Sequence, residues 1–513
     1  MTTITFKDIY IGTPDGETEA QNEKFEELFY DSNNKYEELM SRNEKFLVIG
    51  SKGSGKTYLA HYVCRKATSK QKRKIIDSKT FWQDKLTNIN GMVLDNELTF
   101  ALCKWFVLDK LGRLIVENLS FVQQHNIFSK KNKLNRFINS FDNDSLFKAI
   151  KSISNNSLSK ENGISGRFST GGSLNNISSE YACTSNSVKN KSKSLTVEYS
   201  RKEFYELIGT YEKKIKDAIT EDDDITLIFD DLDELDKRKP VTELIENDVI
   251  LNLIKIVKSY NIDFNLLKKK VKLILLIRTD VLNELQMYDT NLSKIKTSCG
   301  VELYWITSTS SGENHPLMSM VLHKIKASCP AVKNVSKKEL YNRLFPDKIN
   351  GKRPLEYLLD FSFGRPRDIV TYLNHVIKEF PENTCFTAKS LKEVRKLYSS
   401  DFYDELLNES YFHENPQYTK ECLQLISGLK RTSFTYDLLF DYYSQYAERY
   451  TLILDLEKAV KFLYKMGVIG NVWKVENDSK THSSWSYRKD AMDEVDFSKK
   501  FTIHYALRKK FSI

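Results

Sequence analysis

Residues 50–57 read GSKGSGKT. It matches the pattern G-x-x-x-x-G-K-[ST] at each required place, after the apolar segment KFLVIG (45–50) and at the start of KTYLAHYVCRKA (56–67), which has helical periodicity. Glycines let the backbone curl around phosphate groups, and the N-terminus of the following helix adds the positive end of a dipole. A Gly/Ser-rich turn that binds nothing is the weak alternative. We expect a nucleotide site formed by Gly50, Ser51, Lys52, Gly53, Ser54, Gly55, Lys56 and Thr57.

A second segment supplies the carboxylates that such a site needs. ITLIFDD (225–231) has the pattern of a buried strand that ends in Asp230 and Asp231, and parallel α/β sheets place ligands at the carboxyl ends of their strands. We expect Lys56 to reach the β- and γ-phosphates of ATP, while Thr57 and Asp230 hold Mg²⁺, in part through water. Asp231 is the candidate for the group that polarises the attacking water. Three further acids are expected to form the solvated start of a helix, where acids are favoured: Asp233, Glu234 and Asp236.

Three arginines are candidates for groups that sense or stabilise the γ-phosphate. Arg278 ends the apolar segment LILLIR, so it is expected either to act as a sensor or a tether for the acids, or to lie on the surface paired with Asp280 or one of those acids. FGRPRDIVTYLNHV (363–376) has the glycine, proline and aspartate of a helix start. Arg365 or Arg367 can reach the nucleotide from there, as a sensor or as a finger acting between subunits. The alternative is a helix cap with one arginine in a salt bridge.

The order of apolar and periodic segments predicts an α/β core. Strands are expected at 45–50, 74–78, 225–231, 271–278 and 301–306, with helical segments between them. This alternation is typical of βαβ units and a mainly parallel five-stranded sheet, the P-loop NTPase fold class.

Beyond residue 310 the pattern becomes helical. Helices are expected at 315–328, 336–345, 353–361, 366–380 and 387–408, and again near 418–428, 435–446 and 454–466. Two short strands, at 467–475 and 483–488, then complete a winged-helix-like α+β module. The expected domains are a helical lead-in (1–44), the P-loop core (45–310, with a Ser/Asn/Gly/Lys-rich insertion at 152–195), a helical lid (311–410) and the winged-helix-like domain (411–513).

Composition limits the classes of function. The 513 residues are 40% hydrophobic with a formal charge of +9, which permits contact with nucleic acid without requiring it. The seven cysteines form no CxxC pair and no Cys/His set has zinc spacing, so we expect reduced thiols and no structural metal. The N-terminal residues do not resemble a signal peptide, and no apolar run reaches the ~18 residues of a membrane span. These features favour a cytoplasmic protein without membrane contact.

Four motifs together resemble a known group. FLVIGSKGSGKT (46–57), LIFDDLDEL (227–235), LILLIRTDVL (273–282) and GRPRDIVTYLN (364–374) are similar, in that order, to STAND/KAP-related bacterial P-loop ATPases of the AAA-like, additional-strand class. The resemblance extends from about residue 10 to 406, and the tail looks like the winged-helix ending of such proteins.

The resemblance implies the strand order 5-1-4-3-2, a lid that carries a sensor arginine, frequent oligomerisation and a place in bacterial defence against phage or mobile DNA. The chain departs from the wider class in two ways. Asp231 stands where a catalytic glutamate is usual, and no nuclease, TIR or membrane effector segment is recognisable. Both leave open whether this is a fast ATPase or a slow switch.

Three functions follow as hypotheses. The first is an ATP-hydrolysing switch or motor, the ATPase component of a defence system, acting as a homo-oligomer or with an effector protein encoded nearby. The second is a DNA-binding regulatory or loading ATPase of the initiator or transposition type, indicated by the net charge and the winged-helix-like tail. The third is a nucleotide-dependent scaffold without turnover.

Overall fold

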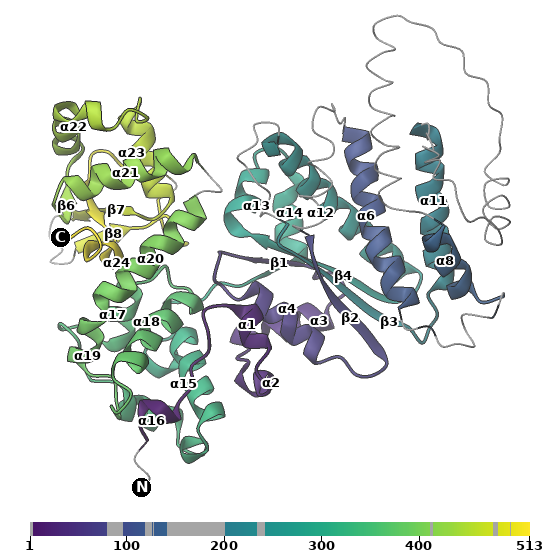
Figure 1. Cartoon of the computed structure of the whole chain (residues 1–513), viewed down its shortest axis with the longest axis horizontal. Coiled ribbons are helices and arrows are strands. Elements are labelled where there is room, and N and C mark those ends of the chain that lie inside the picture. The colour runs from purple at the N-terminus through teal and green to yellow at the C-terminus, as the bar shows by residue number, and fades with distance from the viewer. Residues whose placement is uncertain are drawn as a thin grey trace, which may run out of the picture.

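The computed structural model of the chain describes residues 4–78, 96–117, 119, 126, 128–140, 201–232, 242–410, 414–475, 481–492 and 494–513, with only the backbone described for 201–203 and 242–246. The insertion at 152–195 and the three acids at 233, 234 and 236 lie outside these residues. Figure 1 shows a sheet-and-helix part and a mainly helical part, with the N-terminal segment running between them.

A five-stranded parallel sheet forms the centre of the first part. Its strand order is β2-β3-β4-β1-β5, the order that the family resemblance implies. The carboxyl ends of β1, β3 and β4 lie at one edge, since Gly50 pairs with Arg278 and Asp77 pairs with Asp230 in parallel register. The strands are β1 (Leu47–Gly50), β2 (Gln71–Asp77), β3 (Asp224–Asp230), β4 (Lys270–Arg278) and β5 (Gly300–Glu302).

Strand β5 is shorter than the sequence predicts. The expected strand at 301–306 ends at Glu302, and one further ladder contact joins Leu303 N–H to the Ile49 carbonyl at 2.7 Å. The chain then leaves the sheet because the Trp305 indole N–H donates to the carbonyl of Ser54 at 2.8 Å, which draws this segment under the P-loop.

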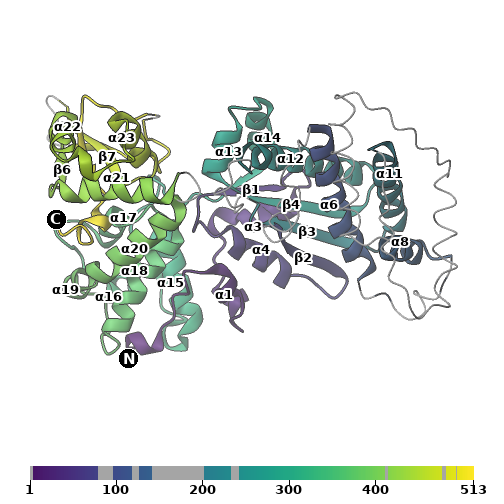
Figure 2. The same cartoon turned by 45° about the horizontal axis from the view of Figure 1, so that its top comes forward.

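Helices cover both faces of the sheet, as is required when strands are buried on both sides. Figure 2 shows α6 and α12 on one face and α3 and α4 on the other. The first group is α6 (Asn96–Val116), α8 (Lys130–Asn139), α11 (Arg201–Ala218), α12 (Thr242–Leu266), α13 (Thr279–Leu285) and α14 (Asn291–Cys299). The second is α1 (Gly16–Ala20), α2 (Phe25–Leu28), α3 (Lys35–Ser41) and α4 (Lys56–Arg65). Each face packs on its own apolar cluster.

Six helices form the lid that follows β5. They are α15 (Pro316–Ser328), α16 (Lys337–Leu344), α17 (Pro354–Asp360), α18 (Pro366–Glu379), α19 (Ala388–Glu393) and α20 (Arg395–Ser410). The single helix expected at 387–408 is divided in two at Val394, which is the C-cap of α19. The predicted bend before α18 is confirmed: Gly364 has φ +71°, and a Cβ there would lie 2.3 Å from Ile306.

The C-terminal residues form a winged-helix-like α+β unit. Three helices, α21 (Pro416–Gly428), α22 (Tyr436–Gln445) and α23 (Leu456–Lys465), accompany the strands, and α24 (Tyr505–Arg508) follows them. The sheet is antiparallel and four-stranded, in the order β6-β9-β7-β8, rather than the expected two-stranded hairpin. Its strands are β6 (Ser433–Phe434), β7 (Ile469–Lys474), β8 (Thr481–Ser484) and β9 (Lys500–Ile503). Neither β6 nor β9 has an alternating pattern long enough to be recognised in sequence.

The lid and the C-terminal unit share one apolar cluster, which also takes in Phe6, Ile9 and Ile11 from the N-terminus. At the junction the ring of Phe402 stacks on that of His504, with centroids 5.0 Å apart. The lid and the C-terminal unit therefore do not have separate apolar cores, and the division into four domains stays a prediction. In the part of the chain that the structure describes, no helix is both long and apolar enough to cross a membrane.

Candidate functional site

The loop between β1 and α4 needs glycine for two physical reasons. Gly53 and Gly55 have φ values of +77° and +99°, a region that residues with a Cβ rarely adopt. A Cβ on Gly50 would lie 2.2 Å from Ser54 Oγ, so that position requires glycine for space. Helix α4 begins at Lys56 directly after Gly55, and its first N–H groups and dipole favour an anion. Residues 50–57 thus have the backbone geometry of a phosphate-binding loop, and we call this loop the phosphate cradle.

Lys56 lies across this loop. Its Nζ donates to the Gly50 carbonyl at 2.9 Å and to the Ser51 carbonyl at 3.3 Å. The ammonium group is thus held over the residues that would surround a phosphate.

The two expected magnesium ligands are in direct contact. Thr57 Oγ1 donates to Asp230 Oδ2 at 2.8 Å, and Asp230 is 6% exposed. Hydroxyl and carboxylate oxygens are hard donors of the kind that Mg²⁺ takes, usually together with water and phosphate oxygens. The residues present therefore fit this ion.

Asp231 follows the strand in a left-handed backbone conformation, with φ +52°. Its N–H donates to Asp230 Oδ1 at 2.9 Å, which turns the chain sharply at the strand end. Both aspartates line one pocket with the P-loop. The catalytic role of Asp231 stays a prediction.

Arg278 makes the ion pair with Asp280 that one of the two alternatives predicts, but it makes it as a buried side chain. It pairs with Asp280 through two hydrogen bonds, of 3.0 Å from Nε and 2.5 Å from Nη2, and its Nη2 lies 3.7 Å from Glu409. Its side chain is nevertheless only 5% exposed and lines the pocket, so the expectation of a surface arginine is wrong.

Arg365 fastens the lid to the P-loop. It is buried between Asp368 and Glu409, with Nη2 3.0 Å from Asp368 Oδ1 and Nη1 3.0 Å from Glu409 Oε2. The same Nη1 donates to the carbonyl of Lys52 at 3.0 Å. Burial alone would lower the pKa of Arg365, but the two carboxylates raise it above its ordinary value. This agrees with the helix-cap and salt-bridge alternative.

Arg367 is the arginine of the pair that lines the pocket. Its Nη1 is 2.6 Å from Glu405, and its Nε donates to the carbonyl of Pro14 at 3.1 Å. A Cβ on Gly53 would lie 3.0 Å from the Cβ of Arg367, so the lid presses directly on the loop. The two arginines at the start of α18 thus point differently, Arg367 toward the pocket and the N-cap residue Arg365 into the lid.

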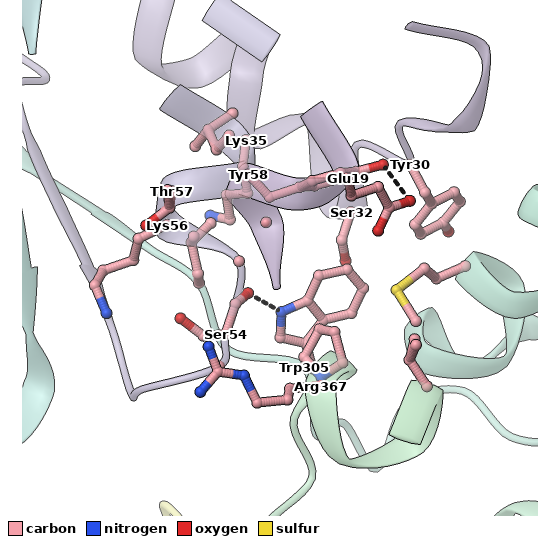
Figure 3. A pocket seen from close by; sticks show the side chains of 18 of the residues that line it. Glu19, Tyr30, Ser32, Lys35, Ser54, Lys56, Thr57, Tyr58, Trp305 and Arg367 are labelled. Carbon is pink, nitrogen blue, oxygen red and sulfur yellow. Dashed lines mark hydrogen bonds between the residues drawn. The ribbon is translucent and has the colours of Figure 1, made fainter. Parts of the chain in front are cut away.

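The pocket continues from the phosphate cradle to a second end that the sequence did not reveal. There Lys324 forms an ion pair with Glu19, each side chain 3% exposed, and donates to Tyr58 Oη at 3.1 Å. Figure 3 shows Glu19, Tyr58 and Trp305 converging on the hollow. Apolar and aromatic walls surround it, formed by Phe29, Tyr30, Trp305, Met320 and Val370. Lys324 is the one charged residue among the buried residues of α15.

The lid matches a known family of domains. Residues 315–407 match the family of FunZ-associated C-terminal helical domains, which covers the lid and a minor part of the chain. A Walker-type ATPase of Pyrococcus abyssi is similar to the chain at 14% identity, over 94% of this chain and 98% of that one, with a TM-score of 0.35. That TM-score is too low to support a conclusion about fold or function. No curated protein matches the chain.

Proposed function

We propose that this chain binds ATP with Mg²⁺ in the pocket between the P-loop and the lid. We propose further that it hydrolyses the ATP and acts as a switch or motor protein. The observation that carries the proposal is the contact of Thr57 with Asp230 beside a complete P-loop and under a lid that presents Arg367. The apolar second end of the pocket has the character of a site for a nucleoside.

Each residue then has one task. Backbone N–H groups of the loop and Lys56 bind the phosphates, and Thr57 and Asp230 hold the ion. When bound, Mg²⁺ neutralises charge on the phosphate oxygens. Asp231 accepts a hydrogen bond from the attacking water, and Arg367 stabilises charge on the γ-phosphate.

Calorimetry and phosphate release test the proposal with purified chain, ATP, GTP and MgCl₂. We expect ATP binding and Mg²⁺-dependent turnover, loss of both in Lys56→Ala, and retained binding with at least ~100-fold slower turnover in Asp231→Asn. Wild-type chain that binds neither nucleotide would disprove the proposal. Binding without turnover under every condition would favour the nucleotide-dependent scaffold.

The biological role is proposed on the resemblance of the four motifs to STAND/KAP-related ATPases. We infer a defence ATPase whose effector is a separate polypeptide, assembled as a homo-oligomer or with that partner. Light scattering with and without ATP tests the assembly, and phage challenge of cells carrying the wild-type or Lys56→Ala gene with its neighbours tests the role.

A second candidate is a DNA-binding regulatory ATPase, for which α23 provides the observation. This helix exposes Lys458, Lys461 and Lys465 at helical spacing, within the winged-helix-like unit. Nearby, Lys499 lies over the ring of Trp473, 3.9 Å from its centroid. Full chain with the three helix lysines changed to glutamine should lose salt-dependent DNA binding. No DNA binding by the wild-type chain at low salt would remove this candidate.

A further inference from the structure

Two carboxylates on the lid helix α20, Glu405 and Glu409, face the phosphate cradle one helical turn apart. They contact cations from three separate parts of the chain: Lys52 of the P-loop, Arg278 at the end of β4, and Arg365 and Arg367 of the lid. These cations gather around the site that we propose for the phosphates of ATP. The inference below rests on that proposed function.

The two acids hold their cations in different ways. Glu409 contacts Arg365 at 3.0 Å, and their side chains are only 15% and 4% exposed. Asp368 and the carbonyl of Lys52 complete the hydrogen bonds of Arg365, so this cluster is buried and enclosed. Neither Glu409 nor Arg365 lines the nucleotide pocket, so their contact is not open to exchange with a phosphate group.

Glu405 is placed where a phosphate group can replace its carboxylate. It lies 2.6 Å from Arg367 and 3.6 Å from Lys52, and the three side chains are 26%, 25% and 21% exposed. Arg367 and Lys52 line the nucleotide pocket, whereas Glu405 lines the adjoining hollow with Asp15 and Asp368. The same two cations therefore lie between a carboxylate and the expected position of the phosphates.

We propose that Glu405 is a positioning residue that takes the place of the terminal phosphate. Without nucleotide, its carboxylate binds the cationic N–H groups of Arg367 and Lys52, and the terminal phosphate of ATP then binds the same N–H groups. Carboxylate and phosphate oxygens compete for the same charge-assisted hydrogen bonds, and the phosphate offers more charge and more acceptor oxygens. Burial alone would raise the pKa of Glu405, but Arg367, Lys52 and Arg365 lower it below its usual value. The carboxylate is therefore ionised near neutral pH.

Helix α20 connects Glu405 to the C-terminal unit, so the release of Glu405 from its two cations can affect that unit. Helix α20 carries Phe402, which stacks on His504, and Ser399, whose Oγ accepts from the Lys510 N–H at 2.8 Å. The C-terminal unit also reaches the core directly, because Lys489 Nζ lies 2.8 Å from Glu302. ATP that removes the partners of Glu405 lets α20 turn about the buried Arg365 cluster, which still joins Glu409 to the P-loop. The contact between Lys489 and Glu302 is then expected to break.

The test compares Kd values for MgATP and MgADP in wild type, Glu405→Gln, Glu405→Asp and Asp401→Asn. Asp401 lies one turn earlier on α20, pairs with His375 and touches neither cation, so it controls for the loss of one negative charge. We expect Glu405→Gln to bind MgATP about fivefold more tightly, in line with the loss of a part-exposed ion pair. MgADP, which lacks the γ-phosphate, should change less, and Asp401→Asn should leave both values unchanged.

The shorter Glu405→Asp variant should fall between wild type and Glu405→Gln. If the wild type binds ATP and both Glu405 variants bind it with the same or a weaker affinity than the wild type, this inference is wrong and the proposed function still stands. A wild type that binds neither nucleotide overturns the proposed function, and the inference with it.

Carbodiimide cross-linking of Lys489 to Glu302 gives a second measurement. The cross-link should form without nucleotide, weaken with MgATP, and be weak in Glu405→Gln without nucleotide. Equal cross-link yields in all three samples would show that the release of Glu405 does not affect the C-terminal unit.

Discussion

Thr57 Oγ1 and Asp230 Oδ2 are joined by a 2.8 Å hydrogen bond although 173 residues separate them in the chain. The contact exists because β3 ends beside the start of α4, which brings a hydroxyl and a carboxylate together at the carboxyl edge of a parallel sheet. This pair is the centre of the proposed magnesium site, and the first prediction tests it.

Asp230→Asn should reduce Mg²⁺-dependent turnover by at least ~100-fold, because an amide holds the ion less well than a carboxylate. Asp224→Asn is the matched control, since Asp224 begins the same strand at its opposite end and bonds to Gln71. Phosphate release over a MgCl₂ titration measures both variants. Equal losses in the two variants would show that Asp230 has no special role.

Variants at Arg365 and Arg367 should change different properties. The Arg365 variant should lower stability, and the Arg367 variant should slow turnover. Arg365→Ala leaves Asp368 without its buried cation and takes from Glu409 the nearer of its two, so we expect a loss of about 3–5 kcal/mol in unfolding free energy. Arg367→Ala removes a part-exposed side chain and should leave the melting temperature nearly unchanged while slowing turnover. Differential scanning calorimetry and steady-state kinetics distinguish the two, and the reverse pattern would contradict the assignment.

The buried pair of Glu19 and Lys324 joins the N-terminal segment to the lid helix α15. Lys324→Met alone leaves a buried carboxylate and should cost about 3–5 kcal/mol of unfolding free energy. The double variant Glu19→Gln/Lys324→Met should recover part of that loss, because no uncompensated charge remains. Urea denaturation of Lys324→Met, Glu19→Gln and the double variant measures the coupling energy between the two side chains. If the losses in the two single variants add up to the loss in the double variant, the pair contributes no interaction energy.

Trp305 should report nucleotide binding by its fluorescence. Its indole N–H donates to the Ser54 carbonyl within the P-loop, and its ring lines the pocket. ATP should change the emission of the wild-type chain, and Trp305→Phe should lose most of that change while calorimetry still detects binding. Trp473→Phe is the control that should keep it, because Trp473 lies on β7 of the C-terminal unit and does not line the pocket.

His504 should make the folded state sensitive to acid. Burial, aided by the charges of nearby arginines, lowers its pKa to about 3 in the folded chain, from about 6.5 when unfolded. The unfolded chain therefore binds the proton more readily, so stability is full above pH 6.5 and falls toward pH 3. The expected slope is about 1.4 kcal/mol per pH unit.

The imidazole also accepts from the Ala506 N–H at 3.3 Å through Nδ1, so protonation there would remove the cap of α24. His504→Asn keeps an acceptor at this place and removes the titration. Urea denaturation at pH 7 and pH 5 should show a smaller difference for His504→Asn than for wild type. Equal differences would mean that other groups cause the acid sensitivity.

Much of the core was predictable because its signals are local. A strand, a glycine loop and a helix lie in one contiguous segment, and the apolar residues of β3 and β4 lead directly to Asp230 and Arg278. The parallel arrangement follows from the alternation of strands and helices. The break between α19 and α20 and the short strands β6 and β9 were missed, because segments this short carry no periodicity of their own.

The glycine loop of the phosphate cradle, the acids at the end of β3 and the α/β class could thus be read from local patterns in the sequence. Three relationships became visible once the chain was folded: Arg367 lines the pocket while Arg365 is buried, Glu405 and Glu409 meet the cations around the P-loop, and Glu19 pairs with Lys324. The difference comes from distance along the chain. A motif works through backbone geometry within a few residues, whereas an ion pair between residues 305 positions apart depends on how whole helices pack.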